Sequence, residues 1–214
     1  MKTSMRKCLI SALLATVAWA GSAAAATKSA EPFDYFTNNW NVVGLKDYPR
    51  GARVTPDNRL FLAGTNTAVR VQFGRTLAPL NRQHGKLALA GWMPIMVIAA
   101  DDEAVHYEFT YWATPMPGVK DWGKAFDWPT EGENFLIWVR YQATNKSDQP
   151  AEARVDVRLD AQAASHPKAG APEEPPVDLS LHRSYSIEKV LAPGGTVEGA
   201  ARFAFFPVKD AAAF

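Results

Sequence analysis

The chain has 214 residues, with 23 Lys and Arg, 22 Asp and Glu, a single cysteine and a formal net charge of +1. Because the charge is nearly balanced and Lys and Arg do not cluster, the sequence argues against a nucleic-acid partner, which needs a basic surface to neutralise phosphates. The lone Cys8 argues against an internal disulfide and against a thiolate metal site.

The amino-terminal segment has the order of a cleavable secretory signal. Its basic start contains Lys2, Arg6 and Lys7, and an apolar run (9–20) and a small-residue stretch (21–26) follow. The apolar run is too short to cross about 30 Å of hydrocarbon, for which a helix needs about 20 residues. We therefore predict that residues 1–26 are a signal peptide and that the mature protein is periplasmic or extracellular.

The mature chain, residues 27–214, is predicted to be a single domain. Loss of the signal lowers the Lys and Arg count from 23 to 20 against 22 Asp and Glu, so the mature net charge is about −2. It also removes Cys8, so the fold must depend on its core alone. No later apolar run is long enough for a membrane helix, so we do not expect an integral membrane protein.

From Trp40 onward the apolar side chains recur with a period of two, which is typical of half-buried strands. The alternation is clear in residues 69–73, 105–114 and 153–160, where Arg154, Asp156, Arg158 and Asp160 are predicted to form a charged outer face. Turn residues at 100–103, 144–150 and 193–195 predict three antiparallel hairpins. With further strands near Val42, Leu60 and Val71, an all-β antiparallel sandwich is the most economical fold, and a barrel is the alternative.

Two segments depart from the strand pattern. Residues 165–176 contain four prolines among acidic residues and alanines, and we expect a mobile surface loop there. Residues 115–134 form a long connection between strands, in which residues 120–127 are predicted to be a short helix.

This long connection also contains the candidate binding site. It places two tryptophans among four carboxylates, namely Asp121, Trp122, Asp127, Trp128, Glu131 and Glu133. Aromatic rings stack on the apolar face of a sugar and carboxylates accept hydrogen bonds from its hydroxyls, so a carbohydrate site is predicted. The alternative is that Trp122 and Phe126, four residues apart, pack the helix onto the sandwich edge.

The same residues allow two other chemistries. Glu131 and Glu133 could act as an acid–base pair in glycoside hydrolysis, although no partner base or nucleophile is evident and solvated loop charges explain them better. The four carboxylates could also hold a calcium ion, which prefers six to eight oxygen ligands, but they lack the EF-hand pattern. We therefore predict neither a bound metal nor a cofactor, and expect that the chain is not catalytic on its own.

Several segments resemble the amino-terminal β-sandwich of bacterial exported six-hairpin glycosidase-like proteins. They are residues 39–44, 107–117, 128–134, 139–145 and 191–195, with the sequences NWNVVG, YEFTYWATPMP, WPTEGEN, VRYQATN and LAPGG. In that family the sandwich precedes a helical toroid that supplies the catalytic carboxylates. The resemblance implies an accessory, carbohydrate-associated module whose partners are a poly- or oligosaccharide and a catalytic domain that would follow this chain.

Two other functions remain open. A small sandwich enzyme of the mutarotase type would use His106, Glu108 or Glu131 as acid and base, and would gather them in one pocket. A structural or interaction protein of the cell envelope would expose Trp112 and Trp138 on a sheet face. If a second layer covers that face, these two tryptophans belong to the core instead.

Overall fold

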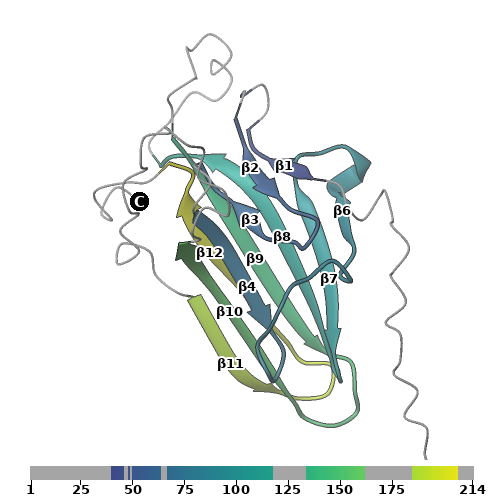
Figure 1. Ribbon diagram of the computed structural model, residues 1–214. Coiled ribbons are helices and arrows are strands. Elements are labelled where there is room, and N and C mark those ends of the chain that lie inside the picture. Colours follow the sequence, from purple (N-terminus) through teal and green to yellow (C-terminus); the bar gives the residue numbers. More distant parts are fainter. Residues whose placement is uncertain are drawn as a thin grey trace, which may run out of the picture. The chain divides into compact units, whose positions relative to one another are not determined.

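The computed structural model describes residues 40–45, 48, 50–63, 67–117, 134–161 and 185–206 (Figure 1). The predicted signal peptide, the predicted helix at 120–127 and the proline-rich segment 165–176 lie outside these residues. Within them the protein is all-β, apart from a single 3-10 turn, η1 (Leu89–Gly91).

The strands form two antiparallel sheets, as expected for a sandwich. One sheet, here called sheet A, has the order β1 (Asn41–Val43), β2 (Ala52–Val54), β3 (Leu60–Phe61), β4 (Thr67–Phe73), β10 (Ala151–Ala161) and β11 (Tyr185–Leu191), and β5 (Ala78–Pro79) also pairs with β4. The other, sheet B, has the order β12 (Thr196–Ala204), β9 (Phe135–Asn145), β8 (Val105–Pro115), β7 (Met96–Asp102) and β6 (Lys86–Ala88).

The period of two places the core between the sheets. On β8, Tyr107, Phe109 and Tyr111 are fully buried, while the residues between them are half-buried on the opposite face. They pack with Val155 and Val157 of β10 in a single apolar cluster that draws on both sheets. The described residues contain no cysteine, so no disulfide stabilises this part of the chain. Burial of the apolar cluster is therefore the main source of its stability.

The outer face of sheet A is charged, as predicted from the alternation in β10. Asp160 forms ion pairs with Arg70, at 2.6 Å from Nε, and with Arg158, at 3.4 Å from Nε, and Arg154 pairs with Glu188 on the neighbouring strand β11. Surface pairs of this kind contribute little stability each, about 0–1 kcal/mol. Their effect is to keep this face hydrated.

One of the three predicted hairpins is confirmed. β7 and β8 pair in register from Met96 opposite Tyr111 to Asp102 opposite Val105. The turn is tighter than expected, since β7 continues through Asp101 and Asp102 and the chain reverses at Glu103, whose φ is 51°.

The other two predicted hairpins are wrong. β9 pairs with β8 and β12 in sheet B, whereas β10 pairs with β4 and β11 in sheet A, so the connection 146–150 crosses between the sheets. The connection from β11 to β12, which contains Gly194 at a φ of 67°, crosses back. The turn residues were identified correctly, but alternation shows only which side chains face the core and not which sheet a strand joins.

The side chain of Asn145 links the β9–β10 connection to the β11–β12 connection. Its side chain is fully buried, and its Nδ2 donates to the carbonyls of Gln149 at 2.7 Å, Leu191 at 3.1 Å and Ala192 at 3.2 Å. Its Oδ1 accepts from the backbone N–H and the hydroxyl of Ser147. A single side chain therefore satisfies backbone groups from both connections, which fixes one against the other.

Candidate functional site

The six residues of the predicted carbohydrate site, Asp121, Trp122, Asp127, Trp128, Glu131 and Glu133, lie outside the described residues, so the structure does not test whether they form a site. The last residue of their connection, Asn134, is described, and it lies directly before β9. A pocket is found beside it.

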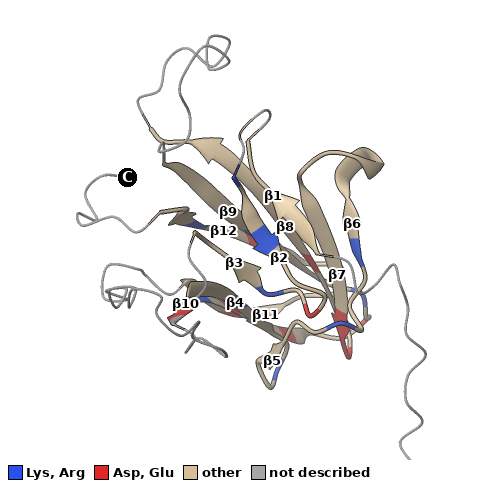
Figure 2. Ribbon diagram, turned by 45° about the horizontal axis from the view of Figure 1, so that its top comes forward, with Lys and Arg blue, Asp and Glu red and all other residues tan. Residues whose placement is uncertain are grey.

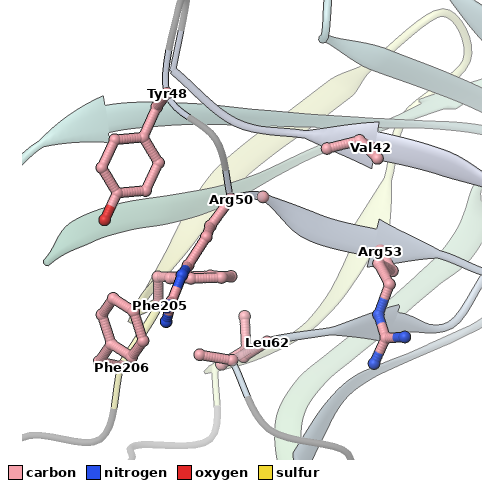
Figure 3. Close-up of a pocket in the computed structure, with 9 residues that line it drawn as sticks. Val42, Tyr48, Arg50, Arg53, Leu62, Phe205 and Phe206 are labelled. Atoms are coloured by element: carbon pink, nitrogen blue, oxygen red, sulfur yellow. The ribbon is translucent and has the colours of Figure 1, made fainter. Parts of the chain in front are cut away.

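This pocket has a volume of about 410 Å³ and lies where the end of sheet A meets the chain leaving β12 (Figure 3). It is lined by Val42, Tyr48, Arg50, Gly51, Arg53, Leu62, Ala63, Phe205 and Phe206. The volume is within the range of small-molecule sites, about 300–1,000 Å³. We refer to it as the arginine–aromatic pocket.

The β1–β2 connection positions the two arginines. Arg53 is central in β2, between Ala52 and Val54, which are both fully buried, so the alternation directs Arg53 outward. Gly51 precedes the strand at a close approach to β1, because a Cβ there would overlap Val42 Cγ1 and lie only 2.9 Å from the Val43 carbonyl oxygen. The glycine therefore lets the chain turn tightly enough for both Arg50 and Arg53 to line the same pocket.

An aromatic ring holds each guanidinium group. The Cζ atom of Arg50 lies 5.7 Å from the centre of the Phe206 ring, and that of Arg53 lies 5.9 Å from the centre of the Trp40 ring. Both distances are within the range of cation–π attraction. Figure 3 shows the two guanidinium groups on either side of Leu62. A ring orients a cation without neutralising it, so both positive charges are retained.

The aromatic wall of the pocket is anchored to both sheets. The Ala63 N–H, just beyond β3, donates to the Phe205 carbonyl at 3.0 Å, and the Phe205 N–H donates to the Phe135 carbonyl at 2.9 Å. The Phe205 ring stacks on Phe135 with 4.4 Å between centroids and meets the Phe206 ring edge-on at 4.8 Å. Because Phe205 and Phe135 are buried, this wall is a rigid continuation of the core.

The charge environment sets this pocket apart from its surroundings. Arg59, Arg70, Arg75, Arg140, Arg154 and Arg158 each lie within 4.0 Å of a carboxylate. Among the described residues, no carboxylate lies that close to Arg50 or Arg53, and both side chains are exposed. In Figure 2 the blue of Lys and Arg is visible on β2, whereas the red of Asp and Glu marks the end of β7.

A second pocket gives a useful contrast. It has a volume of about 270 Å³ and is lined in part by Arg59 and Arg70. Here Asp57 pairs with Arg59 at 2.7 Å and Asp160 pairs with Arg70 at 2.6 Å. Since both cations already have carboxylate partners, this pocket has no comparable capacity for an anion.

The residues of the mutarotase-type alternative do not come together in either pocket. His106 Nδ1 lies 2.7 Å from the Asp101 carboxylate on the exposed end of the β7–β8 hairpin. Glu108 is on the same face of β8 and lines neither of the two pockets, and Glu131 lies outside the described residues. The pair of His106 and Asp101 is an ordinary cross-strand contact between opposite residues.

Trp112 and Trp138 lie opposite each other on β8 and β9, on the outer face of sheet B. Both are half-buried, so neither belongs to the core. Their rings are stacked with 5.7 Å between centroids and 9° between planes, and Arg202 of β12 lies 5.8 Å from the centre of the Trp138 ring on the next strand. The Trp138 ring is thus engaged by Trp112 and Arg202, and its Nε1 donates to Thr114 Oγ1 at 2.8 Å.

Sequence reasoning missed the pocket because its residues come from four separate segments. The signal that could have identified it is the motif Arg50-Gly51-Ala52-Arg53, which leads from the β1–β2 connection into β2. Two arginines around a tight glycine turn are unusual in a chain of nearly balanced charge. The exposed ring of Trp40 and the half-buried ring of Phe206 could not be connected with this motif without the topology.

Within the part of the chain that the structure describes, no helix has the length and hydropathy needed to cross a membrane. The comparisons with known proteins do not identify a relative: no family model, no curated protein and no solved structure matches the chain. The function must therefore be argued from the pocket and from the sequence.

Proposed function

We propose that the chain is an exported, carbohydrate-associated β-sandwich module that binds a poly- or oligosaccharide at the arginine–aromatic pocket. One observation carries the proposal: an open pocket of about 410 Å³ combines aromatic walls with two exposed guanidinium groups that have no carboxylate partner among the described residues. The resemblance noted above supports the same class of ligand and implies an accessory role beside a glycoside hydrolase-like catalytic domain.

The chemistry of the pocket suits a sugar. Saccharides present apolar C–H faces and many hydroxyl oxygens, so a binding site needs flat apolar surface next to hydrogen-bond donors. Trp40, which directly precedes β1 and lies next to the pocket beside Arg53, is 60% exposed, and Val42 of β1, which lines the pocket, is 54% exposed. Trp40 and Val42 provide the apolar surface, and the guanidinium N–H groups provide donors in a fixed fork.

The last residue of the connection that contains the predicted loop site lies beside the pocket. Asn134 ends the connection that contains Trp128, Glu131 and Glu133, and its side chain bonds to Phe206 of the pocket wall. We propose that this connection and the pocket contribute to one binding surface, with Trp128 as the loop residue that contacts the sugar.

Affinity electrophoresis of the full chain tests the proposal. The chain is run through gels that contain neutral or acidic polysaccharides, next to the variants Trp40→Ala, Trp40→Phe and Trp128→Ala. We expect retardation in at least one gel, its loss in Trp40→Ala and its partial recovery in Trp40→Phe, since the phenylalanine ring preserves stacking. No retardation by any polysaccharide would refute the proposal.

A further inference from the structure

We infer that the group recognised in the arginine–aromatic pocket is a carboxylate, so that the ligand is a uronic-acid-containing saccharide. This inference rests on the proposed function and specifies its substrate class. It is carried by Arg50 and Arg53, which line one pocket and each have an aromatic ring, but no carboxylate of the described residues, beside the guanidinium.

The first step of the argument concerns charge. A neutral sugar requires hydrogen-bond donors, which amide or hydroxyl side chains provide without the cost of bringing two cations together. Arg50 and Arg53 both line this pocket, so it carries two positive charges that have no carboxylate partner among the described residues. A carboxylate bound beside either guanidinium gains charge-assisted hydrogen bonds, which are about twice as strong as neutral ones.

The second step concerns geometry. A guanidinium is planar and presents its donors in a fork that matches the two oxygens of a carboxylate. The ring contacts with Phe206 and Trp40 hold both forks in place before a ligand arrives, so less side-chain entropy is lost on binding. Figure 3 shows the two guanidinium groups on either side of Leu62, so each presents its fork to a different part of the pocket.

The third step concerns the pocket floor. Leu62 is 5% exposed and Phe205 is 4% exposed, so apolar atoms form the base on which a ligand would rest. Such a base excludes water from one side of a bound carboxylate, while both guanidinium groups stay exposed to solvent. The base also accommodates the C–H face of the sugar ring that bears this group. A uronic acid combines both features in one residue.

The charge of the whole protein does not account for this arrangement. With about 20 Lys and Arg against 22 Asp and Glu, the mature chain has no general attraction for anions. Arg50 and Arg53 instead place positive charge locally at the pocket. Binding should therefore depend on these two arginines and not on net charge.

The test is calorimetric titration of the full chain with trigalacturonic acid and with its methyl ester, which has the same sugar rings without the negative charges. The variants are Arg50→Gln, Arg53→Gln and Arg53→Lys. The control is Arg75→Gln, which removes one positive charge at the opposite end of β4, where Arg75 pairs with Glu103. Thermal unfolding of each variant verifies that the fold is intact.

We expect the acid to bind more tightly than the ester, and either glutamine variant to weaken acid binding by about tenfold or more while Arg75→Gln leaves it unchanged. Arg53→Lys should recover only part of the affinity, because an ammonium lacks the fork. Equal binding of acid and ester that is unaffected by the pocket variants would overturn the carboxylate inference but leave saccharide binding in place. Binding of neither sugar would overturn the inference, and so would binding of inorganic sulfate, titrated separately, without binding of the acid. Failure of every polysaccharide to retard the chain in the gels would overturn the proposed function as well.

Discussion

Asn134 and Phe206 hold each other through two reciprocal hydrogen bonds. The Phe206 N–H donates to Asn134 Oδ1 at 2.9 Å, and Asn134 Nδ2 donates to the Phe206 carbonyl at 3.1 Å. The two residues are 72 positions apart in the chain, and they close the end of sheet B where β9 begins and the chain leaves β12. This clamp fixes the ring against which Arg50 rests.

Replacement of Asn134 by leucine should destabilise the protein by about 1–3 kcal/mol, because it leaves the partly buried N–H and carbonyl of Phe206 without partners. Urea unfolding gives the free energy directly. Asn134→Asp is the matched control: it keeps the acceptor for the Phe206 N–H and loses only the donor, so its cost should be smaller. An equal cost for both variants would contradict the reciprocal clamp.

Position 199 has room only for glycine, because the ring of Tyr141 on the neighbouring strand lies against it. The two residues are opposite each other on β12 and β9, and a Cβ at position 199 would lie 2.6 Å from Tyr141 Cζ. Gly199→Ala should therefore cost about 1–3 kcal/mol of unfolding free energy through overpacking.

A double-mutant cycle with Tyr141→Leu tests this explanation, because leucine removes the ring atoms that approach Gly199. The cost of Gly199→Ala should shrink in the Tyr141→Leu background. If it is the same in both backgrounds, steric contact with the tyrosine is not its cause.

Asn145 should be among the most sensitive polar positions of the core. Its replacement by leucine removes the hydrogen bonds to three carbonyls and to the Ser147 N–H, and we expect a loss of about 3 kcal/mol or more in unfolding free energy. Ser147→Ala, which removes the hydroxyl's bonds to Asn145 and to the Gln149 carbonyl, should cost less, about 1 kcal/mol. The role assigned to Asn145 is wrong if chemical denaturation shows equal costs for the two variants.

Because of Lys86, the free energy of unfolding should depend on pH in the alkaline range. Desolvation by burial lowers its pKa from 10.5 to about 8, although Asp57 raises it, and its Nζ donates to the Thr55 carbonyl at 2.6 Å. The unfolded chain binds the Lys86 proton more tightly than the folded protein does. The free-energy cost of burying the charged lysine is therefore fully present below about pH 8, and the protein becomes more stable as the pH rises toward 10.5.

The measurement is the free energy of unfolding of the wild-type protein and Lys86→Met at several pH values between about 7.5 and 10. The difference between the two proteins should move in favour of the wild type as the pH rises. A difference that stays constant over this range would show that the pKa of Lys86 is not lowered in the folded state.

Much of the fold could be predicted from the sequence, because side-chain alternation follows directly from the geometry of a strand. The alternation in residues 105–114 predicts one buried face, which Tyr107, Phe109 and Tyr111 form, and the alternation in 153–160 places Arg154 and Asp156 on the outer face of β10, as the structure confirms. Strand partners could not be read in the same way. The turns after Asn145 and Leu191 have the composition of hairpin turns, yet both cross between the sheets.

The pocket was harder to predict than the fold. Arg50 and Arg53 are close in sequence, but Phe206 comes from the far end of the chain, and only the pairing of β12 with β9 brings it to the same place. Local patterns such as the cluster of aromatic and acidic residues at 121–133 can be detected in one window of sequence. A site whose residues come from distant segments can be recognised only once the strand order is known.

The most direct test of the account is to locate the bound saccharide by NMR. Titration of the full chain with trigalacturonic acid, followed through the guanidinium signals of Arg50 and Arg53 and the backbone amides around them, reports which residues contact the ligand. The account predicts that these signals and the Phe206 amide shift together and saturate with the affinity found by calorimetry. Shifts confined to the face of Trp112 and Trp138, with Arg50 and Arg53 unchanged, would contradict it.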